Sequence, residues 1–369
     1  MNAIYFDYNA TCPIRPEVIQ VMSETMARVG NASSVHGAGR EARKRVEAAR
    51  KQVATLANTQ PSRVIFNSGA TEANNTVLKA YDPDKVWISA IEHSSVREVV
   101  AQARQIAVTA EGVVDLGAFE QALQQAERRG ELPDLISVMY VNSETGAIQP
   151  LAEIIALAKI YDIPVHCDAV QAAGRIPVDM DGLGLDFMSL SSHKMGGPQG
   201  VGALIVGRCA EAPRFIDGGT QENFKRAGTE NVAGIVGMGQ AAEMALAGLA
   251  DYGRITSFRD RLQDGMLAAA PGMKIFAKAA PRVGNTLNIA WPGKQASMLL
   301  MNLDLEGVAV STGSACSSGS MKPSQVLTAM GASEEEAAGA LRISLGWNTK
   351  EDEIERFLEI WQKIAQRVA

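Results

Sequence analysis

The sequence has little that would mark a nucleic-acid-binding, membrane or secreted protein. Its 369 residues carry a formal net charge of -6, so we expect no basic surface for nucleic acid and no polybasic membrane patch. No apolar run reaches the roughly 18 residues of a membrane span. The first residues, MNAIYFDYNATCP, lack a basic segment followed by an apolar one, which predicts no signal peptide.

Cysteine is also scarce. The four cysteines (Cys12, Cys167, Cys209 and Cys316) are scattered and form no CxxC pair, which argues against a disulfide framework. The sequence therefore predicts a reducing, cytoplasmic setting, in which a thiol can stay free to react.

The composition is that of an ordinary globular protein, with 46% hydrophobic and 21% charged residues. Its length suits a large domain plus a smaller one. Short apolar strands alternate with amphipathic helices, which predicts an α/β fold with a mainly parallel sheet. We expect strands at Arg63–Asn67, Val86–Ala90, Leu135–Val141, Pro164–Cys167, Phe187–Leu190 and Gly202–Val206. We expect helices at Arg15–Arg28, Glu41–Ala57, Glu72–Ala80, Ser94–Ala107, Leu116–Arg129 and Leu151–Tyr161.

The pattern changes after about residue 250 and predicts a smaller α+β domain. We place the large domain at 15–255, and the small domain at 1–14 and 256–369. The small domain should contain strands near Thr286–Ala290 and Leu341–Leu345, and helices at Ile255–Ala270, Gln295–Leu305, Ser324–Met330 and Lys350–Val368. Ligands of open α/β sheets bind beyond the carboxyl ends of the strands, so polar residues there are the candidates for chemistry.

The first polar cluster, NSGATE at 67–72, lies between a predicted strand and a predicted helix. Its glycine and small residues would let a ligand approach the backbone, and the free N–H groups of a helix start suit a phosphate. The alternative is a simple helix cap by Ser68 or Thr71, and the motif alone favours that explanation.

The second cluster places Asp168 at the end of a buried strand. A buried carboxylate needs a cation or several donors, and a protonated pyridine nitrogen would be such a cation. The alternative is an aspartate that caps the next segment. A metal site with His166 and Cys167 is disfavoured, because adjacent strand residues point to opposite faces.

The third cluster, SLSSHKMGGP at 189–198, places Lys194 after an apolar strand and before a glycine turn. Schiff-base chemistry needs such an amine and a backbone that a ring can approach. A solvated loop lysine is the commoner role of a single lysine. With Asp168 some 26 residues upstream, the cofactor interpretation becomes the stronger one.

The fourth cluster, STGSACSSGS at 311–320, displays Cys316 among small polar residues. A cysteine in such a loop is a candidate nucleophile, although an incidental surface thiol explains it equally well.

Two further residues outside these clusters are candidates. His93 follows a strand and could stack on a cofactor or could be structural. Arg342, inside an apolar strand, needs a carboxylate from the protein or from a substrate.

These motifs together resemble the cysteine desulfurases of the NifS/IscS type, on the fold type I scaffold of pyridoxal-phosphate (PLP) enzymes of the class V aminotransferase family. The resemblance covers nearly the whole chain. Its motifs are YFDYNAT (5–11), GNASSVH (30–36), SGATE (68–72), DAVQ (168–171), SHK (192–194), RAGTEN (226–231), STGSAC (311–316) and LRISLG (341–346).

The resemblance implies a role for each matching residue. Lys194 would bind the cofactor as a Schiff base and move protons, Asp168 would pair with the pyridine nitrogen, and His93 would stack on the ring. The remaining cofactor contacts would be Gln171 and Ser143 at the phenolic oxygen, and Ala70, Thr71, Ser191, His193 and Thr229 at the phosphate. Ser143 departs from the family pattern, which has asparagine there, but a serine hydroxyl can still donate a hydrogen bond.

The resemblance also implies a substrate and partners. Arg342 and Asn31 would bind the carboxylate of L-cysteine, and Cys316 would take its sulfur as a persulfide and release alanine. Thr229 would come from the partner subunit, which implies a homodimer with a shared active site. The sulfur would pass to an acceptor protein, for iron–sulfur clusters or other thio-compounds.

Two alternatives stay open. A selenocysteine or cysteine-sulfinate lyase, or an aminotransferase, could use the same scaffold, although the cysteine loop argues against an aminotransferase. A catalytically silent scaffold protein is disfavoured by the joint presence of Lys194, Asp168, His93 and Cys316.

Overall fold

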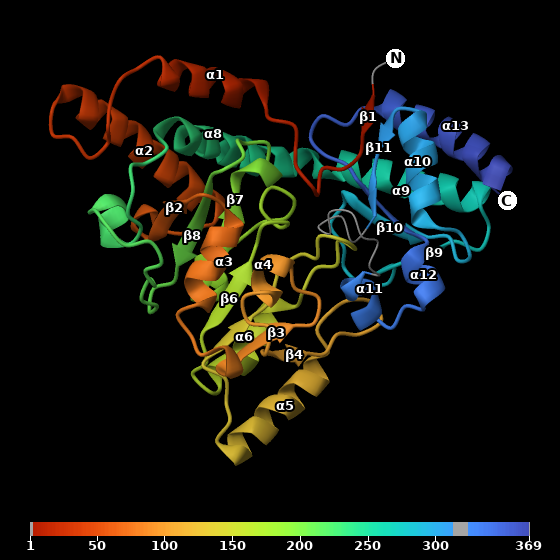
Figure 1. The fold of residues 1–369 in the computed structure, drawn as a ribbon, viewed down its shortest axis with the longest axis horizontal. Coiled ribbons are helices and arrows are strands. Elements are labelled where there is room, and N and C mark those ends of the chain that lie inside the picture. The colour runs from red at the N-terminus through yellow and green to blue at the C-terminus, as the bar shows by residue number, and fades with distance from the viewer. Residues whose placement is uncertain (1–2, 313–323, 369) are drawn as a thin grey trace.

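The computed structural model describes residues 3–312 and 324–368. A seven-stranded sheet dominates the first two thirds of the chain (Figure 1). Its order is β2 (Val64–Asn67), β8 (Gly202–Val206), β7 (Phe187–Ser191), β6 (Val165–Asp168), β5 (Leu135–Ser137), β3 (Val86–Ser89) and β4 (Arg104–Ile106). β8 runs antiparallel to both of its neighbours and the other pairs are parallel, which confirms the mainly parallel sheet.

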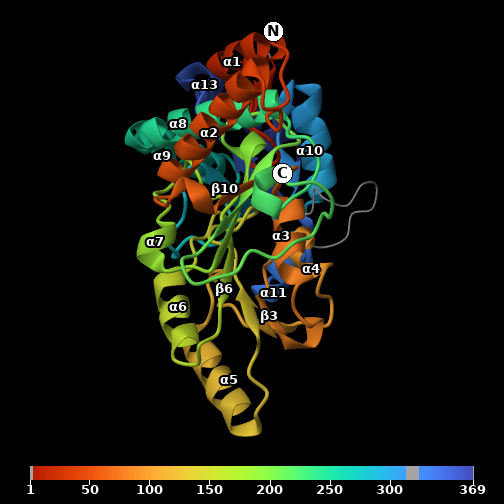
Figure 2. The same ribbon diagram turned by 90° about the vertical axis from the view of Figure 1, so that its left-hand side faces the viewer.

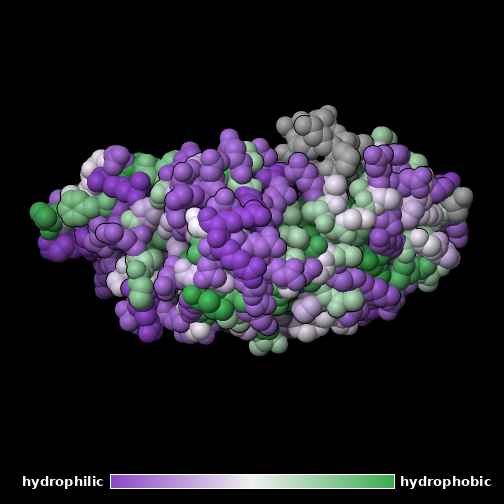
Figure 3. All heavy atoms as spheres, turned by 90° about the horizontal axis from the view of Figure 1, so that it is seen from below, coloured by the Kyte–Doolittle hydropathy of each residue, from purple (hydrophilic) through white to green (hydrophobic). Residues whose placement is uncertain are grey.

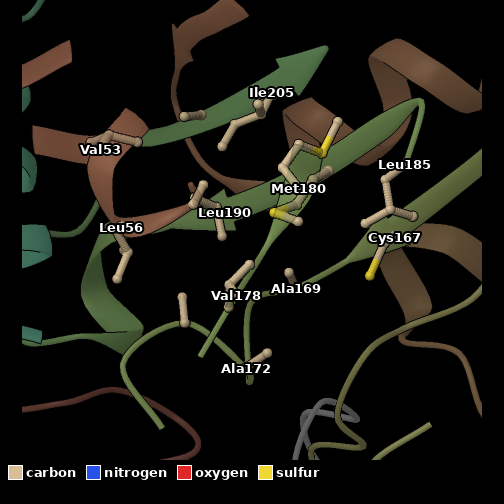
Figure 4. Close-up of a cluster of buried hydrophobic side chains, with 14 of the residues drawn as sticks. Val53, Leu56, Cys167, Ala169, Ala172, Val178, Met180, Leu185, Leu190 and Ile205 are labelled. Carbon is tan, nitrogen blue, oxygen red and sulfur yellow. The ribbon is translucent and has the colours of Figure 1, made fainter. Parts of the chain in front are cut away.

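Helices cover both faces of this sheet, because its strands are apolar on both faces. Figure 2 shows α6 (Leu151–Lys159) on one side of the strands and α3 (Ala70–Leu78) and α4 (Ser94–Arg97) on the other. Alternate strand residues join two different cores: Phe66 packs on the α6 side, whereas Ile65 packs on the α3 side. Figure 4 shows part of the larger core, including Cys167 and Leu190. Its other helices are α1 (Pro16–Met26), α2 (Gly37–Leu56), α5 (Leu116–Arg129), α7 (Met180–Leu183) and α8 (Val232–Gly248).

The C-terminal part of the chain builds a four-stranded antiparallel sheet of its own. Its order is β12 (Ser311–Thr312), β13 (Ala340–Ser344), β10 (Thr286–Ala290) and β9 (Lys274–Ile275). A separate pair, β1 (Ile4–Tyr5) and β11 (Val308–Ala309), joins the start of the chain to this part. The surrounding helices are α9 (Tyr252–Ala269), α10 (Ala296–Leu305), α11 (Gln325–Ala329), α12 (Glu334–Ala338) and α13 (Glu351–Val368).

The start of the chain shares a hydrophobic core with these C-terminal elements. Phe6 stacks on Phe357 of α13 with ring centroids 5.6 Å apart, and Ile4 is buried in the same cluster. The N-terminal segment therefore packs against the C-terminal elements. The domain boundaries themselves, at residues 15 and 255, stay a prediction.

Two sequence expectations about local structure were wrong. The helix expected at Ser94–Ala107 ends at Arg97, and Arg104–Ile106 instead forms the edge strand β4 beside β3. Arg104 pairs with Trp87 and stacks over its ring at 4.4 Å, a tertiary contact that periodicity does not reveal. The strand expected at Leu135–Val141 ends at Ser137, although the backbone beyond it still bonds to β6.

The helix α8 was not predicted, because its glycines weaken the helical signal. Those glycines allow close packing on α1 (Pro16–Met26) and α2. A Cβ at Gly237 would lie 2.7 Å from Met22 Sδ, and one at Gly239 would lie 2.6 Å from the backbone of Ala49.

The helical stretch Val232–Ala269 is long and apolar enough to cross a membrane by length and composition alone. Half of its apolar window is buried inside the protein, where α8 packs against α1 and α2, so we interpret it as a core helix. Figure 3 shows the face seen from below, over which polar side chains are spread with apolar residues scattered among them.

Candidate active site

A cavity of about 860 Å³ lies beyond the carboxyl ends of the parallel strands. It brings together most of the residues that the sequence singled out. These are Ala70, Thr71, His93, Ser143, Asp168, Gln171, Ser191, His193, Lys194 and Arg342.

Two predicted residues of the described chain, Thr229 and Asn31, are not in the wall of this cavity. Cys316 lies outside the described residues. Thr229 lines a smaller neighbouring cavity of about 180 Å³, which shares Ser68 and Gly200 with the large one. Asn31 is exposed in the loop between α1 and α2, where its Oδ1 accepts from the backbone N of Ser33 at 2.8 Å. Within one copy of the chain, Thr229 and Asn31 are therefore apart from the main site.

Asp168 ends β6 with its side chain almost fully buried, at 7% exposure. Its Oδ2 accepts a hydrogen bond from Asn74 Nδ2 at 2.9 Å, and its Oδ1 accepts from the backbone N of Val170 at 3.1 Å. These two donors fix the orientation of a carboxylate that lines the cavity.

His93 belongs to the same hydrogen-bond network through two residues that sequence reasoning missed, Ser95 and Asn74. The backbone N of Ser95 donates to His93 Nδ1 at 3.1 Å, which makes Nδ1 an acceptor and puts the proton of the neutral ring on Nε2. The Ser95 hydroxyl lies 2.8 Å from the same nitrogen and accepts from Asn74 Nδ2 at 2.9 Å. Asn74 therefore links His93 to Asp168. Its position one helical turn after the SGAT motif was the only sequence signal.

Lys194 ends a short 3-10 turn (Ser192–Lys194) directly after β7. Its Nζ donates to the backbone carbonyls of Asn9 at 2.5 Å and Ala10 at 2.7 Å. Gln171 Nε2 donates to the same Asn9 carbonyl at 3.0 Å. Asn9 is thus a site residue that the sequence marked only as part of a motif.

The SGAT segment forms the N-terminus of α3, where Gly69 adopts a φ of 149°. Gly202 on the adjacent strand passes so close that a Cβ there would lie 2.6 Å from Gly69 Cα. Ser191 and His193 line the cavity together with this turn. Burial, with Lys194 and Arg175 nearby, lowers the pKa of His193 to about 4, so its ring is neutral at pH 7.

Arg342 on β13 is 5% exposed and has a carboxylate partner in the protein. Its Nη2 donates to Asp7 Oδ1 at 2.7 Å and its Nη1 to the backbone carbonyl of Ser143 at 3.3 Å. Its buried Nε has no hydrogen-bond partner among the described residues. Asp7 therefore fixes the guanidinium in the cavity wall and leaves a donor for a ligand.

Among the further carboxyl groups that line the cavity, two with a raised pKa were missed, Glu144 and Glu92. Glu144 Oε2 accepts from Ser324 Oγ at 2.5 Å, and burial raises the pKa of Glu144 to about 7. Glu92 accepts from the backbone N of Met139 at 2.6 Å, and burial raises its pKa well above the usual range. Sequence patterns do not reveal such burial, because each residue follows a strand end as an ordinary loop acid would.

The described residues contain no cluster of three or more His, Cys, Asp or Glu side chains that could hold a metal ion. His166 bonds to Ser137 Oγ at 2.8 Å and to Ser189 Oγ at 3.0 Å, while Cys167 belongs to the hydrophobic core (Figure 4).

Residues 4–357 match the family model described as aminotransferase class-V. The chain is 38% identical to the cysteine desulfurase IscS of Dictyoglomus turgidum, over 99% of this chain and 95% of that relative. It is 37% identical to an IscS-like cysteine desulfurase of Mycobacterium tuberculosis, over 96% and 94% of the two chains. A solved NifS-like protein from Rickettsia africae superposes with a TM-score of 0.91 at 36% identity, covering 99% of this chain and all of that one. The chain belongs to the aminotransferase class-V family.

Proposed function

We propose that this chain is a PLP-dependent cysteine desulfurase that takes sulfur from L-cysteine, holds it as a persulfide on Cys316 and releases L-alanine. The observation that supports this most is that Lys194 and Asp168, from the ends of neighbouring strands, line one cavity with His93 and Arg342. The similarity to relatives named cysteine desulfurase over nearly the whole chain supports the same reaction.

The residues present fit PLP. The cavity of about 860 Å³ has room for the cofactor with an amino acid, and Gln171 Oε1 is buried there with no hydrogen-bond partner among the described residues. Ala70, Thr71, Ser191 and His193 would hold the phosphate, Asp168 the pyridine nitrogen, Gln171 and Ser143 the phenolic oxygen, and Lys194 the aldehyde carbon. When bound, PLP supplies an electron sink for charge developing on the substrate.

The side chains of this chain provide binding and proton transfer. Arg342, held by Asp7, would bind the substrate carboxylate, and Asn31 would assist it. Lys194 Nζ would carry a proton to and from substrate carbon, and His93 Nε2 would donate a hydrogen bond into the cavity because Ser95 holds its Nδ1 as an acceptor.

The sulfur step needs a thiolate on Cys316. That thiolate attacks the sulfur atom of L-cysteine, an S–S bond forms, and the bond between substrate carbon and sulfur breaks. The electron pair of the broken bond stays with carbon, which takes a proton and leaves as alanine. A second thiol, on an acceptor protein, would then take the outer sulfur atom.

The test is the product balance of purified protein given L-cysteine. We expect equal amounts of alanine and persulfide-derived sulfur, and Cys316→Ser should abolish sulfur release while the bound cofactor keeps its colour. Cys209→Ser is the matched control, because Cys209 is exposed and lies outside the cavity. Sulfur release by Cys316→Ser at the parent rate would exclude Cys316 as the sulfur carrier.

We further propose a cytoplasmic homodimer in which Thr229 completes the phosphate site of the other subunit. Thr229 lies beside Ser68 and Gly200 yet outside the main cavity of its own chain, as a residue that serves a second subunit would. Sedimentation should show a dimer. Thr229→Ala should weaken PLP binding without dissociating the dimer. The sulfur acceptor would be a protein that supplies iron–sulfur clusters or other thio-compounds.

A further inference from the structure

A second cavity, of about 150 Å³, also has Lys194 in its wall. None of its other lining residues has a role in the proposed reaction. The rest of the wall comes mainly from the N-terminal segment, the loop after β6, the end of α8, the start of α9 and the loop after β13. The residues that carry the argument are Cys12, Arg15, Arg175, Asp251, Tyr252 and Arg254.

The wall of this cavity carries three arginines and a single acid. The acid, Asp251, is already paired, because Arg254 Nε lies 2.9 Å from its Oδ2. Arg254 also donates to the backbone carbonyls of Thr349 at 2.8 Å and Trp347 at 3.4 Å. The charge of Arg254 is therefore neutralised within the protein.

The other two arginines have no such partner. Arg175 is only 6% exposed; its Nη2 donates to the neutral Asn9 Oδ1 at 3.3 Å, and its buried Nη1 has no hydrogen-bond partner among residues 3–312 and 324–368. Arg15 Nε is likewise buried without a partner, and its guanidinium stacks on Trp347 at 4.7 Å. No carboxylate pairs with either arginine in the described part of the chain. Burying a cation without a counter-charge is costly, and a guanidinium does not shed its proton.

Glu17 favours the charged form of Arg15 but forms no ion pair with it among the described residues, and it is not in the wall of the cavity. The ionisable groups in the wall do not supply that counter-charge either. Cys12 donates its S–H to the carbonyl of Lys194 at 2.9 Å, and burial raises the pKa of Cys12, so it is a neutral thiol. Burial also raises the pKa of Tyr252, which stays a neutral phenol beside Arg175. The described residues in the wall of this cavity therefore leave Arg15 and Arg175 without a paired counter-charge.

We propose that this cavity binds a compact inorganic anion, a halide or a small oxyanion such as sulfate, between Arg15 and Arg175. The size of the cavity suits an ion of this kind and is too small for the cofactor with a substrate. The anion would also support Lys194: Arg175 holds the side chain of Asn9, and the carbonyl of Asn9 accepts from Lys194 Nζ.

The test is the thermal midpoint (Tm) of the holoenzyme in bromide, titrated at constant ionic strength against a bulky organic anion. A ligand of the folded state raises Tm in a saturable way. We expect the parent to show this rise in Tm, Arg175→Met to lose it, and Arg175→Lys to show a smaller rise. Arg208→Met is the control, because it removes an exposed arginine outside the cavity and should keep the full response.

The outcomes decide the proposal directly. A response to bromide alone makes this a halide site, and a response to sulfate as well makes it a general anion site. No saturable response in the parent, or an equal response in Arg175→Met, overturns the proposal. If Arg175→Met does not fold, Arg15→Gln decides in the same way.

Crystals soaked in bromide give an independent readout. Anomalous scattering should place an ion in this cavity, and bromide found only elsewhere would contradict the assignment. Neither measurement depends on cysteine turnover, so failure here and failure of the proposed function are distinguishable.

Discussion

The two cavities that share Lys194 differ in whether their charged side chains have partners within the protein. In the large cavity, the protein partners the key charges: Asp168 has two donors and Arg342 has Asp7. In the small cavity, Arg15 and Arg175 have no carboxylate among the described residues. Charges that bind an exchanging substrate keep their geometry between turnovers only if the protein holds them. An unpaired buried charge instead favours a ligand that remains bound through many turnovers.

Asn9 connects the two cavities. Its Oδ1 accepts from Arg175 and its carbonyl accepts from Lys194 and Gln171. Its Nδ2 donates to Thr286 Oγ1 on β10 at 2.9 Å. One side chain and one carbonyl thus couple the cofactor lysine to the arginine of the small cavity and to the C-terminal sheet.

The strongest test of the comparison removes the residue that the cavities share. Lys194→Ala should lower turnover of L-cysteine on the order of 10³-fold or more, because it removes both the covalent anchor and a proton carrier. Borohydride reduction and peptide mass spectrometry should find the cofactor on the parent peptide and not on the variant. Lys278→Ala, an exposed lysine elsewhere, is the control, and undiminished turnover by Lys194→Ala would contradict the assignment.

The next test asks whether Arg342 binds substrate or only Asp7. Arg342→Lys should raise KM for L-cysteine about 10- to 100-fold, because a lost charge-assisted hydrogen bond is worth about 1.5–3 kcal/mol. Asp7→Asn keeps an acceptor for Arg342 Nη2 and should raise KM for L-cysteine by a smaller factor. Equal effects of the two variants would mean that Arg342 is structural.

A smaller effect is expected where Asn74 links His93 to Asp168. Asn74→Ala removes the donor shared by Asp168 and Ser95, and should lower kcat about tenfold, a free-energy difference of about 1.4 kcal/mol. Asn75→Ala is the matched control, since the Asn75 side chain donates to the backbone carbonyl of Thr71 and to neither Asp168 nor Ser95. A fall in KM alone, or an equal effect of Asn75→Ala, would show that the link does not position the site.

The last prediction concerns stability and not turnover, and rests on Glu144, which the large cavity keeps protonated below about pH 7. Its pKa is raised from 4.5 to about 7, so between these pH values the folded state holds a proton that the unfolded state has lost. The free energy of unfolding should therefore fall as pH rises through this range, by at most about 3 kcal/mol.

Glu144→Gln should flatten that decline in a series of Tm measurements between pH 4.5 and 7. Glu98→Gln changes an exposed acid of the same cavity wall and should leave the decline intact. An unchanged slope in Glu144→Gln would show that Glu144 does not titrate in this range.

The sequence by itself determined the alternation of strands and helices and the positions of Asp168 and Lys194. Both residues directly follow apolar runs, and parallel strands bring their carboxyl ends to one edge of a sheet. Local pattern was enough for these features, because each depends on residues that are neighbours in the chain.

Only the tertiary structure decided the partners of those residues. Asn9 meets Thr286, Arg342 meets Asp7, and Asn74 meets Asp168 across separations of 277, 335 and 94 residues. The edge strand β4 and the close packing of α8 were likewise decided by contacts with distant elements. The physical reason is that burial and charge pairing depend on which segments meet in space, and periodicity describes only one segment at a time. The unpaired arginines behind Lys194 could not be found in the sequence, because a missing partner becomes visible only when every neighbour is in place.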